Sequence, residues 1–113
     1  MADGLFLAFT HPRAAQTEEQ MNTWYSRFHL PEILRVPGVE TASRYRSLEP
    51  DPEFAYLAAY NLRGDNLRDI VARIFADGPN RTPTDATRQE PQWQSARAME
   101  SCVSIEPATI PPP

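Results

Sequence analysis

Lysine is missing from this sequence of 113 residues, and cysteine occurs once, as Cys102. The eleven residues counted as lysine or arginine are all arginine. Schiff-base chemistry through a lysine amine is therefore excluded. A single cysteine excludes an internal disulfide and a metal site made of several cysteines. It also predicts a reducing, cytoplasmic setting, in which Cys102 is an inert buried thiol.

Long apolar runs, an excess of basic charge and glycine-rich loops are also missing. No apolar run approaches the roughly 20 residues of a membrane-spanning helix, and the net charge of −4 lacks the positive footprint of a nucleic-acid-binding protein. The four glycines are scattered, so no phosphate-binding loop is expected. His11 and His29 have no partners at metal-ligand spacing, and no serine or cysteine nucleophile motif occurs. We therefore predict a small-molecule partner, without nucleic acid, membrane, metal or cofactor.

The spacing of apolar residues predicts four strands and two helices in the order βαββαβ. The predicted strands are Leu5–Thr10, Val39–Leu48, Phe54–Leu62 and Ala98–Glu106, and the predicted helices run from Thr17 to near His29 and from Asp65 to Gly78. One domain should cover residues 1–107, with a loop or flap at 79–94. We predict that the proline-rich tail at 108–113 is disordered.

Local signals predict where the two helices begin and end. Thr17 fits the N-cap of a capping box, and Pro31 should end the first helix near His29, with a short helical turn after it. Asp65 fits the N-cap of the second helix. Gly78 should end that helix in a left-handed conformation.

This order predicts an α+β fold of the ferredoxin-like type, with a four-stranded antiparallel sheet and two helices on one face. The strands at Leu5–Phe9 and Phe54–Tyr60 are apolar at successive positions, although two helices can cover only one face of the sheet. The other face would expose a large apolar patch. We predict that two copies pack sheet to sheet as a homodimer with twofold symmetry. The alternative is that the 79–94 loop covers the patch.

Three residues are candidates for chemistry. His29 suits acid–base catalysis near neutral pH, and a position at a helix C-terminus would raise its pKa; alternatively its ring caps the helix. Tyr25 lies four residues earlier and can share a helix face with His29, either orienting a substrate oxygen or packing in the core. Arg44 could point inward and bind a carboxylate or enolate oxygen, or point outward into solvent.

Four aromatic residues are candidates for contacts with the substrate. Tyr56 and Tyr60 share one strand face with Ala58, which suits a pocket or the dimer seam, whereas the opposite face, with Leu57 and Ala59 on it, suits close helix packing. Trp24 fits the core by its size and position and is a candidate pocket wall. Trp93, in the predicted flap, is a candidate lid residue.

These motifs resemble EthD-like members of the dimeric α+β barrel superfamily. The resemblance rests on Trp24-Tyr25-x-x-Phe28-His29-Leu30-Pro31-Glu32, Val36-Pro37-Gly38-Val39, Arg44-Tyr45-Arg46 and Tyr56-Leu57-Ala58-Ala59-Tyr60. It covers most of residues 4–75 and the final strand, but not the 79–94 segment or the tail. The resemblance implies a pocket between sheet and helices that His29 faces. It also implies cofactor-free isomerase, cyclase, lyase or monooxygenase activity on small aromatic or polyketide-like molecules.

The sequence thus predicts a small cofactor-independent enzyme of isomerase, cyclase or lyase type. In it His29 would move a proton, while Tyr25 and Arg44 orient the substrate and stabilise an oxyanion. Two alternatives stay open. One is a cofactor-free monooxygenase of phenolic substrates, and the other is a non-catalytic ligand-binding protein or dimeric scaffold.

Overall fold

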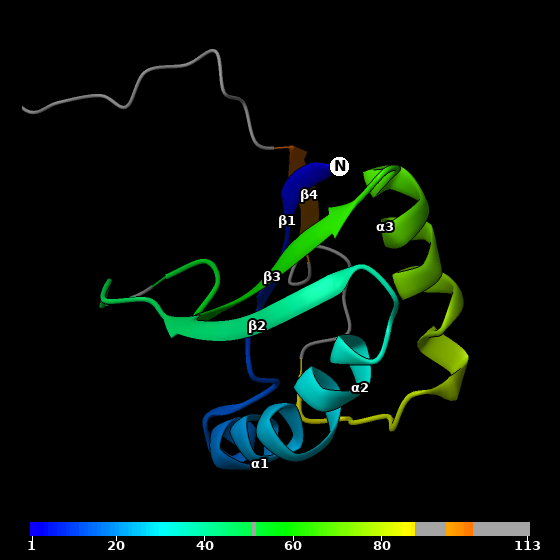
Figure 1. Cartoon of the computed structure of the whole chain (residues 1–113). Coiled ribbons are helices and arrows are strands. Elements are labelled where there is room, and N and C mark those ends of the chain that lie inside the picture. The colour runs from blue at the N-terminus through cyan, green and yellow to red at the C-terminus, as the bar shows by residue number, and fades with distance from the viewer. Residues whose placement is uncertain (51, 88–94, 101–113) are drawn as a thin grey trace, which may run out of the picture.

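The computed structural model describes residues 1–50, 52–87 and 95–100 (Figure 1). Its strands are β1 (Ala2–Thr10), β2 (Val39–Arg46), β3 (Tyr56–Gly64) and β4 (Ser95–Glu100). Its helices are α1 (Glu18–Trp24), a π turn (Tyr25–His29), α2 (Leu30–Leu34) and α3 (Leu67–Ala76), with 3-10 turns at Ala15–Thr17 and Gly78–Asn80. The predicted order βαββαβ is confirmed, with α1, the π turn and α2 together forming the first helical unit.

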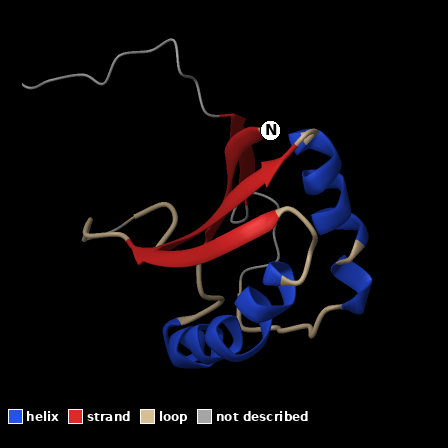
Figure 2. Ribbon diagram, in the orientation of Figure 1, coloured by secondary structure: helices blue, strands red, loops and turns tan. Residues whose placement is uncertain are grey.

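The four strands form one antiparallel sheet in the order β2-β3-β1-β4. In its register Phe6 of β1 pairs with Tyr60 of β3 and with Ala98 of β4. Figure 2 shows the helices gathered on one side of the sheet. Between the two layers lies the core, in which Tyr60 and Met21 are fully buried. The predicted ferredoxin-like fold is therefore confirmed.

The first helical unit does not end near His29, so that prediction was wrong. Helical backbone continues from Glu18 to Leu34, and the N–H of Leu30 bonds to the carbonyl of Tyr25, five residues earlier. Pro31 has no N–H to donate, and a π turn immediately before it lets the helix continue through the proline. His29 consequently lies in the middle of a helical unit.

Two of the predicted caps are also wrong. Thr17 precedes α1, but its hydroxyl makes no capping bond; Oγ1 accepts from the N–H of Ala14 and lies 3.1 Å from the carbonyl oxygen of Ala86. Asn66 rather than Asp65 caps α3, because its Oδ1 accepts from the Asp69 N–H at 3.1 Å. The Thr17 hydroxyl is thus used by Ala14 and Ala86, whereas the Asp65 carboxylate is exposed and lies 3.9 Å from the N-terminal amine.

A left-handed glycine is found before β2 and not after α3. Gly38 has φ of 101° and is the only residue with positive φ in the described part of the chain. Gly78 instead begins a 3-10 turn, so the predicted left-handed end of α3 was wrong. At Gly38 an added Cβ would come within 2.5 Å of the Ile70 side chain, which makes glycine necessary there for space as well as for conformation.

The segment after α3 is tied down rather than free along residues 81–87. It runs beneath α2 toward α1 (Figure 1). Ala86 is fully buried, and its carbonyl accepts from the N–H of Arg13 at 2.7 Å. Trp93, Cys102, the tail at 108–113 and the predicted end of the last strand lie outside the described residues.

Side chains on the strands alternate between a side that faces the helices and a side that does not. On β3 the helix-facing side carries buried Tyr56, Ala58 and Tyr60. The apolar residues of the opposite side, here called the open side, are Leu5, Leu7, Phe9, Tyr45, Leu57, Ala59 and Met99, and the same side also carries the exposed polar residues Ser43 and Asn61. Leu57 and Ala59 therefore do not pack against the helices, contrary to the prediction, because the helices cover the tyrosine side.

Candidate functional site

A cavity of about 360 Å³ lies between the sheet and the helices. Its walls come from β1, the first helical unit, α3 and the 81–87 segment, and they include the following side chains: Phe6, Thr10, Trp24, Tyr25, His29, Ile33, Phe75 and Arg81. The volume falls within the usual range for a small-ligand site. Most of the wall is apolar or aromatic, and the few polar groups are concentrated around His29.

His29 is held between two aromatic rings by the π turn. Its imidazole stacks on the Trp24 ring at 4.3 Å and 23° and meets the Tyr25 ring edge-on at 4.9 Å. A π turn carries more residues per turn than an α-helix, so one histidine can touch both of these neighbours. Its Nδ1 atom is buried and has no hydrogen-bond partner among residues 1–50, 52–87 and 95–100. Such a nitrogen is available to a ligand.

The surroundings of His29 keep the imidazole neutral at physiological pH. The pKa of His29 is lowered to about 4, chiefly by burial; the positive charges of Arg81 and Arg44 also lower it, and the Glu32 carboxylate offsets part of the effect. The predicted rise in pKa was wrong for two reasons. The helix does not end at His29, and burial outweighs the helix dipole.

Tyr25 lies beside His29, with its hydroxyl 3.5 Å from the Thr10 hydroxyl. Burial raises the pKa of Tyr25, an effect that the hydrogen bond with Thr10 and the nearby Arg44 charge only partly offset. The phenol therefore stays protonated at neutral pH and can donate a hydrogen bond. Both Tyr25 and His29 line the cavity.

Arg44 points to the helix-facing side of β2, where a chain of polar groups holds it. Its Nη1 donates to Asn22 Oδ1 at 2.8 Å, Asn22 Nδ2 donates to the Tyr56 hydroxyl at 3.2 Å, and that hydroxyl donates to Glu18 Oε1 at 2.5 Å. The guanidinium carbon lies 4.1 Å from the Tyr25 ring centre and 4.6 Å from that of Tyr56. Within the described structure its Nε and Nη2 atoms are buried without partners.

The four aromatic candidates are divided by the fold. Trp24 lines the cavity, whereas Tyr56 and Tyr60 lie in the buried layer next to it and are not part of its wall. Tyr60 is fully buried, its hydroxyl has no partner in the described part of the chain, and burial raises its pKa. Trp93 lies outside the described residues, so its predicted role as a lid is untested.

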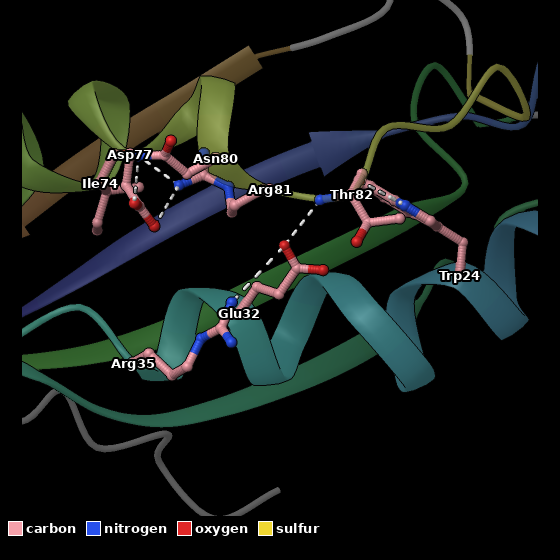
Figure 3. A network of polar contacts seen from close by, with 8 residues as sticks. All are labelled: Trp24, Glu32, Arg35, Ile74, Asp77, Asn80, Arg81 and Thr82. Carbon is pink, nitrogen blue, oxygen red and sulfur yellow. Dashed lines mark hydrogen bonds and ion pairs between the residues drawn. The ribbon is translucent and has the colours of Figure 1, made fainter.

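Arg81 is a cavity residue that sequence reasoning missed. Its side chain is only 13% exposed, and its Nη1 donates to the Ile74 carbonyl at 2.7 Å and lies 3.8 Å from the Asp77 carboxylate (Figure 3). The one available signal was the spacing of four residues between Asp77 and Arg81. That spacing crosses Gly78 and a proline, which indicated a loop rather than a fixed pair.

Glu32 fastens the 81–87 segment to the first helical unit. The Thr82 N–H donates to Glu32 Oε2 at 2.8 Å, and the Thr82 carbonyl accepts from Trp24 Nε1 at 3.0 Å (Figure 3). Hydrogen bonding from Thr82 lowers the pKa of Glu32, with a smaller contribution from Arg35. Trp24 is therefore held on one side by Thr82 and stacks on His29 on the other, which fixes this wall of the cavity.

Residues 1–50, 52–87 and 95–100 contain no group of three or more His, Cys, Asp or Glu placed to hold a metal ion. No helix within them is long and apolar enough to span a bilayer.

The fold and the cavity define a ferredoxin-like α+β protein with a ligand-sized space between its sheet and helices. No protein-family model matches the sequence, and no curated protein matches it either. Solved structures do share the fold. They include an EthD family protein from Bacillus halodurans C-125, with 16% identity, a TM-score of 0.61 and coverage of 90% of this chain and 100% of that one.

Two further structures have similar scores. A proposed monooxygenase from Shewanella loihica PV-4 has 8% identity and a TM-score of 0.59, and it covers 90% of this chain and 97% of its own. HapK from Hahella chejuensis has 11% identity and a TM-score of 0.57, with coverage of 94% and 99%. These similarities confirm the predicted fold. They also include an EthD family structure, the kind of relative that the sequence motifs indicated. At such identities they establish the fold alone.

Proposed function

We propose that this protein is a cofactor-independent enzyme that uses His29 to move a proton on a small, largely apolar aromatic or polyketide-like substrate. The observation that carries the proposal is a half-buried, neutral histidine in the wall of a cavity of about 360 Å³. Its Nδ1 is unpartnered in the part of the chain that is described. Phe6, Ile33 and Phe75 supply apolar wall against which an aromatic body packs.

The neutral imidazole accepts a proton from an acidic carbon or a phenol of the substrate. Negative charge then appears on a substrate oxygen close to the new imidazolium. The Tyr25 phenol donates a hydrogen bond to that oxygen, while Arg44 and Arg81 stabilise its charge. Because burial makes this imidazolium more acidic than an ordinary one, it returns the proton readily to another atom of the substrate. Return of the proton to another carbon gives isomerisation. Attack of the substrate anion on a carbonyl of the same molecule, with the proton passed to the oxygen of that carbonyl, gives cyclisation. Loss of a leaving group from the adjacent carbon, with the proton passed to that group, gives elimination.

The test is a screen of enolisable and phenolic aromatics, followed by two variants at residue 29. His29→Ala removes the base, and His29→Phe removes it while keeping a ring against Trp24. We expect both to lower kcat by about 10²–10⁴-fold, the usual contribution of a positioned acid–base group. His11→Ala is the control, because His11 is a histidine that does not line this cavity. Unchanged turnover in His29→Phe would remove His29 from the chemistry.

The same screen distinguishes the proposed acid–base reaction from two other functions, which are oxygenation and ligand binding without catalysis. A neutral histidine that deprotonates a phenol also prepares an electron-rich anion for reaction with dioxygen, and one structural neighbour is described as a proposed monooxygenase. Consumption of dioxygen with turnover would favour oxygenation. Ligand binding without any turnover, and with equal affinity in His29→Phe, would favour a binding protein.

We further propose that two copies pack through the open side of the sheet. Tyr45 and Met99 are each 58% exposed there and Leu5 is 37% exposed, next to half-buried Leu7 and Leu57. These apolar side chains lie on one side of the sheet together with the polar Ser43 and Asn61, and exposed apolar side chains gathered in this way are typical of an interface. The same surface on a second copy complements it with twofold symmetry.

A further inference from the structure

Arg81 gives the cavity a fixed positive charge beside His29. The side chain is 13% exposed, and a single guanidinium nitrogen, Nη1, carries its hydrogen bond to Ile74 and its contact with Asp77. The Asp77 carboxylate is 3.8 Å away and its side chain is 36% exposed, so it is an outer and partly solvated partner. The remaining donors of Arg81 have no acceptor among the residues described, and the side chain lines the cavity.

A second positive charge lies behind Tyr25. Arg44 has no carboxylate within ion-pair distance in the described chain, and its contacts are the Asn22 amide and two tyrosine rings. The acidic group whose charge acts on His29 is Glu32, which already accepts from Thr82 and lies 3.9 Å from Arg35. Among the described residues that line the cavity, Arg81 is the one with a permanent charge, and no carboxylate is part of the wall, so the wall itself favours an anion.

We infer that the substrate is a small aromatic carboxylic acid, bound as the carboxylate against Arg81 with its ring in the apolar part of the cavity. A planar guanidinium fork matches a planar carboxylate, and a charge-assisted bond in a dry site is stronger than a neutral one. Phe6 and Phe75 contact each other edge-on at 5.8 Å and form the apolar wall for the ring. This inference rests on the proposed function for the reaction, whereas the preference for a charged ligand can be measured without turnover.

A bound acidic substrate also raises the pKa of His29, the proposed base. A bound carboxylate offsets the positive charges of Arg81 and Arg44, so the imidazolium form of His29 becomes easier to make. Binding and protonation are then linked, because a ligand that favours imidazolium must bind more tightly when His29 is protonated. An uncharged analogue of the same shape has no such effect.

The experiment compares 2-naphthoate with 2-naphthamide, which have nearly the same shape and differ in charge. Titration calorimetry at neutral pH gives both affinities for the full chain. We expect naphthoate to bind at least about tenfold more tightly, as a charge-assisted hydrogen bond predicts. Arg81→Met should reduce the ratio to about one by weakening naphthoate and leaving naphthamide within about twofold. Arg81→Lys should keep part of the preference, because it keeps the charge.

Arg68→Met is the matched control, because it removes the same charge from an exposed position of α3 outside this cavity. It should keep the full preference for naphthoate. A second readout follows the His29 ring by NMR. Naphthoate should raise the pKa of His29 and naphthamide should leave it unchanged.

Equal affinities for the two probes in the unmodified protein would overturn the inference, whether or not the variants fold. An unchanged ratio in Arg81→Met would overturn it as well. Both results leave His29-dependent turnover untouched. Conversely, unchanged turnover in His29→Phe would contradict the proposed function and would leave the measured preference for naphthoate in place. The two proposals can therefore fail independently.

Discussion

The two sides of the sheet use the same strands for different purposes. On the helix-facing side Phe6 and Tyr60 are buried, and Phe6 forms part of the wall of a cavity that also has His29 and Arg81 in its wall. On the open side Leu5, Tyr45 and Met99 are apolar and exposed, and the described residues place no helix over them. One side borders an enclosed cavity, and the other leaves large apolar side chains exposed.

This contrast explains why the sequence of β3 does not alternate between apolar and polar residues. Strands covered by helices on one side normally alternate apolar and polar residues. Here Leu57 and Ala59 alternate with Tyr56, Ala58 and Tyr60, so both sides are apolar. The helices account for the tyrosine side, and a second copy of the chain would account for the other.

The largest expected effect is on self-association, and it comes from placing a charge in the proposed interface on the open side. Leu57→Asp places a charge at the centre of the proposed interface, opposite Tyr45 and Phe9 in the sheet register. Burying an unpaired carboxylate there should weaken self-association by at least about 100-fold. Light scattering should give about twice the 12.8 kDa chain mass for the unmodified protein and 12.8 kDa for the variant.

Ser26→Asp is the control, since it adds the same charge at an exposed position of the π turn. It should leave the dimer intact. A stable monomer of the unmodified chain at micromolar concentration would contradict the proposed interface. Ligand affinity measured on the Leu57→Asp monomer would then show whether the cavity depends on the second copy.

The fold could be predicted from the sequence because the signals for strands and helices are local and periodic. The strand and helix patterns depend on residues two to four apart, which the chain displays directly. Sequence reasoning could not decide which side of β3 the helices cover, because Tyr56 and Leu57 are both compatible with burial. That choice depends on packing across the whole layer, where large rings fill the space beneath the helices.

The candidate site was predicted only in part. His29, Tyr25 and Arg44 do gather on the helix-facing side, where the ring of Tyr25 contacts both of the others. The π turn and the role of Arg81 could not be found from the sequence. A π turn has no distinct residue signature, and Arg81 reaches the cavity only because the chain turns at Gly78 and returns across α2.

A smaller effect tests the helix-facing side through pH. The folded protein holds His29 with a pKa of about 4 against an ordinary value of 6.5, with Arg81, Arg44, Glu32 and Tyr25 around it. Between these values the unfolded chain binds a proton that the folded chain does not, so stability falls as the pH falls. We expect His29 to account for a loss of up to about 3 kcal/mol in the free energy of unfolding.

Urea unfolding at several pH values checks this, with His29→Phe as the comparison. Above the ordinary histidine pKa the two proteins should show parallel dependence on pH. As the pH is lowered, the unmodified protein should lose stability more steeply than His29→Phe. Equal slopes throughout, or an NMR titration that places the His29 pKa near 6.5, would contradict the burial argument.

The smallest expected effect separates two tyrosines on the same strand face. The Tyr60 hydroxyl is buried without a partner in the described part of the chain, whereas the Tyr56 hydroxyl bonds to Glu18 and Asn22. Tyr60→Phe should therefore raise the free energy of unfolding by about 1 kcal/mol, and Tyr56→Phe should lower it by a similar amount. Denaturant midpoints of the two variants give both signs in one experiment. Because both residues face the helices, neither change should alter self-association, and a loss of stability in Tyr60→Phe would mean that its hydroxyl has a partner in solution.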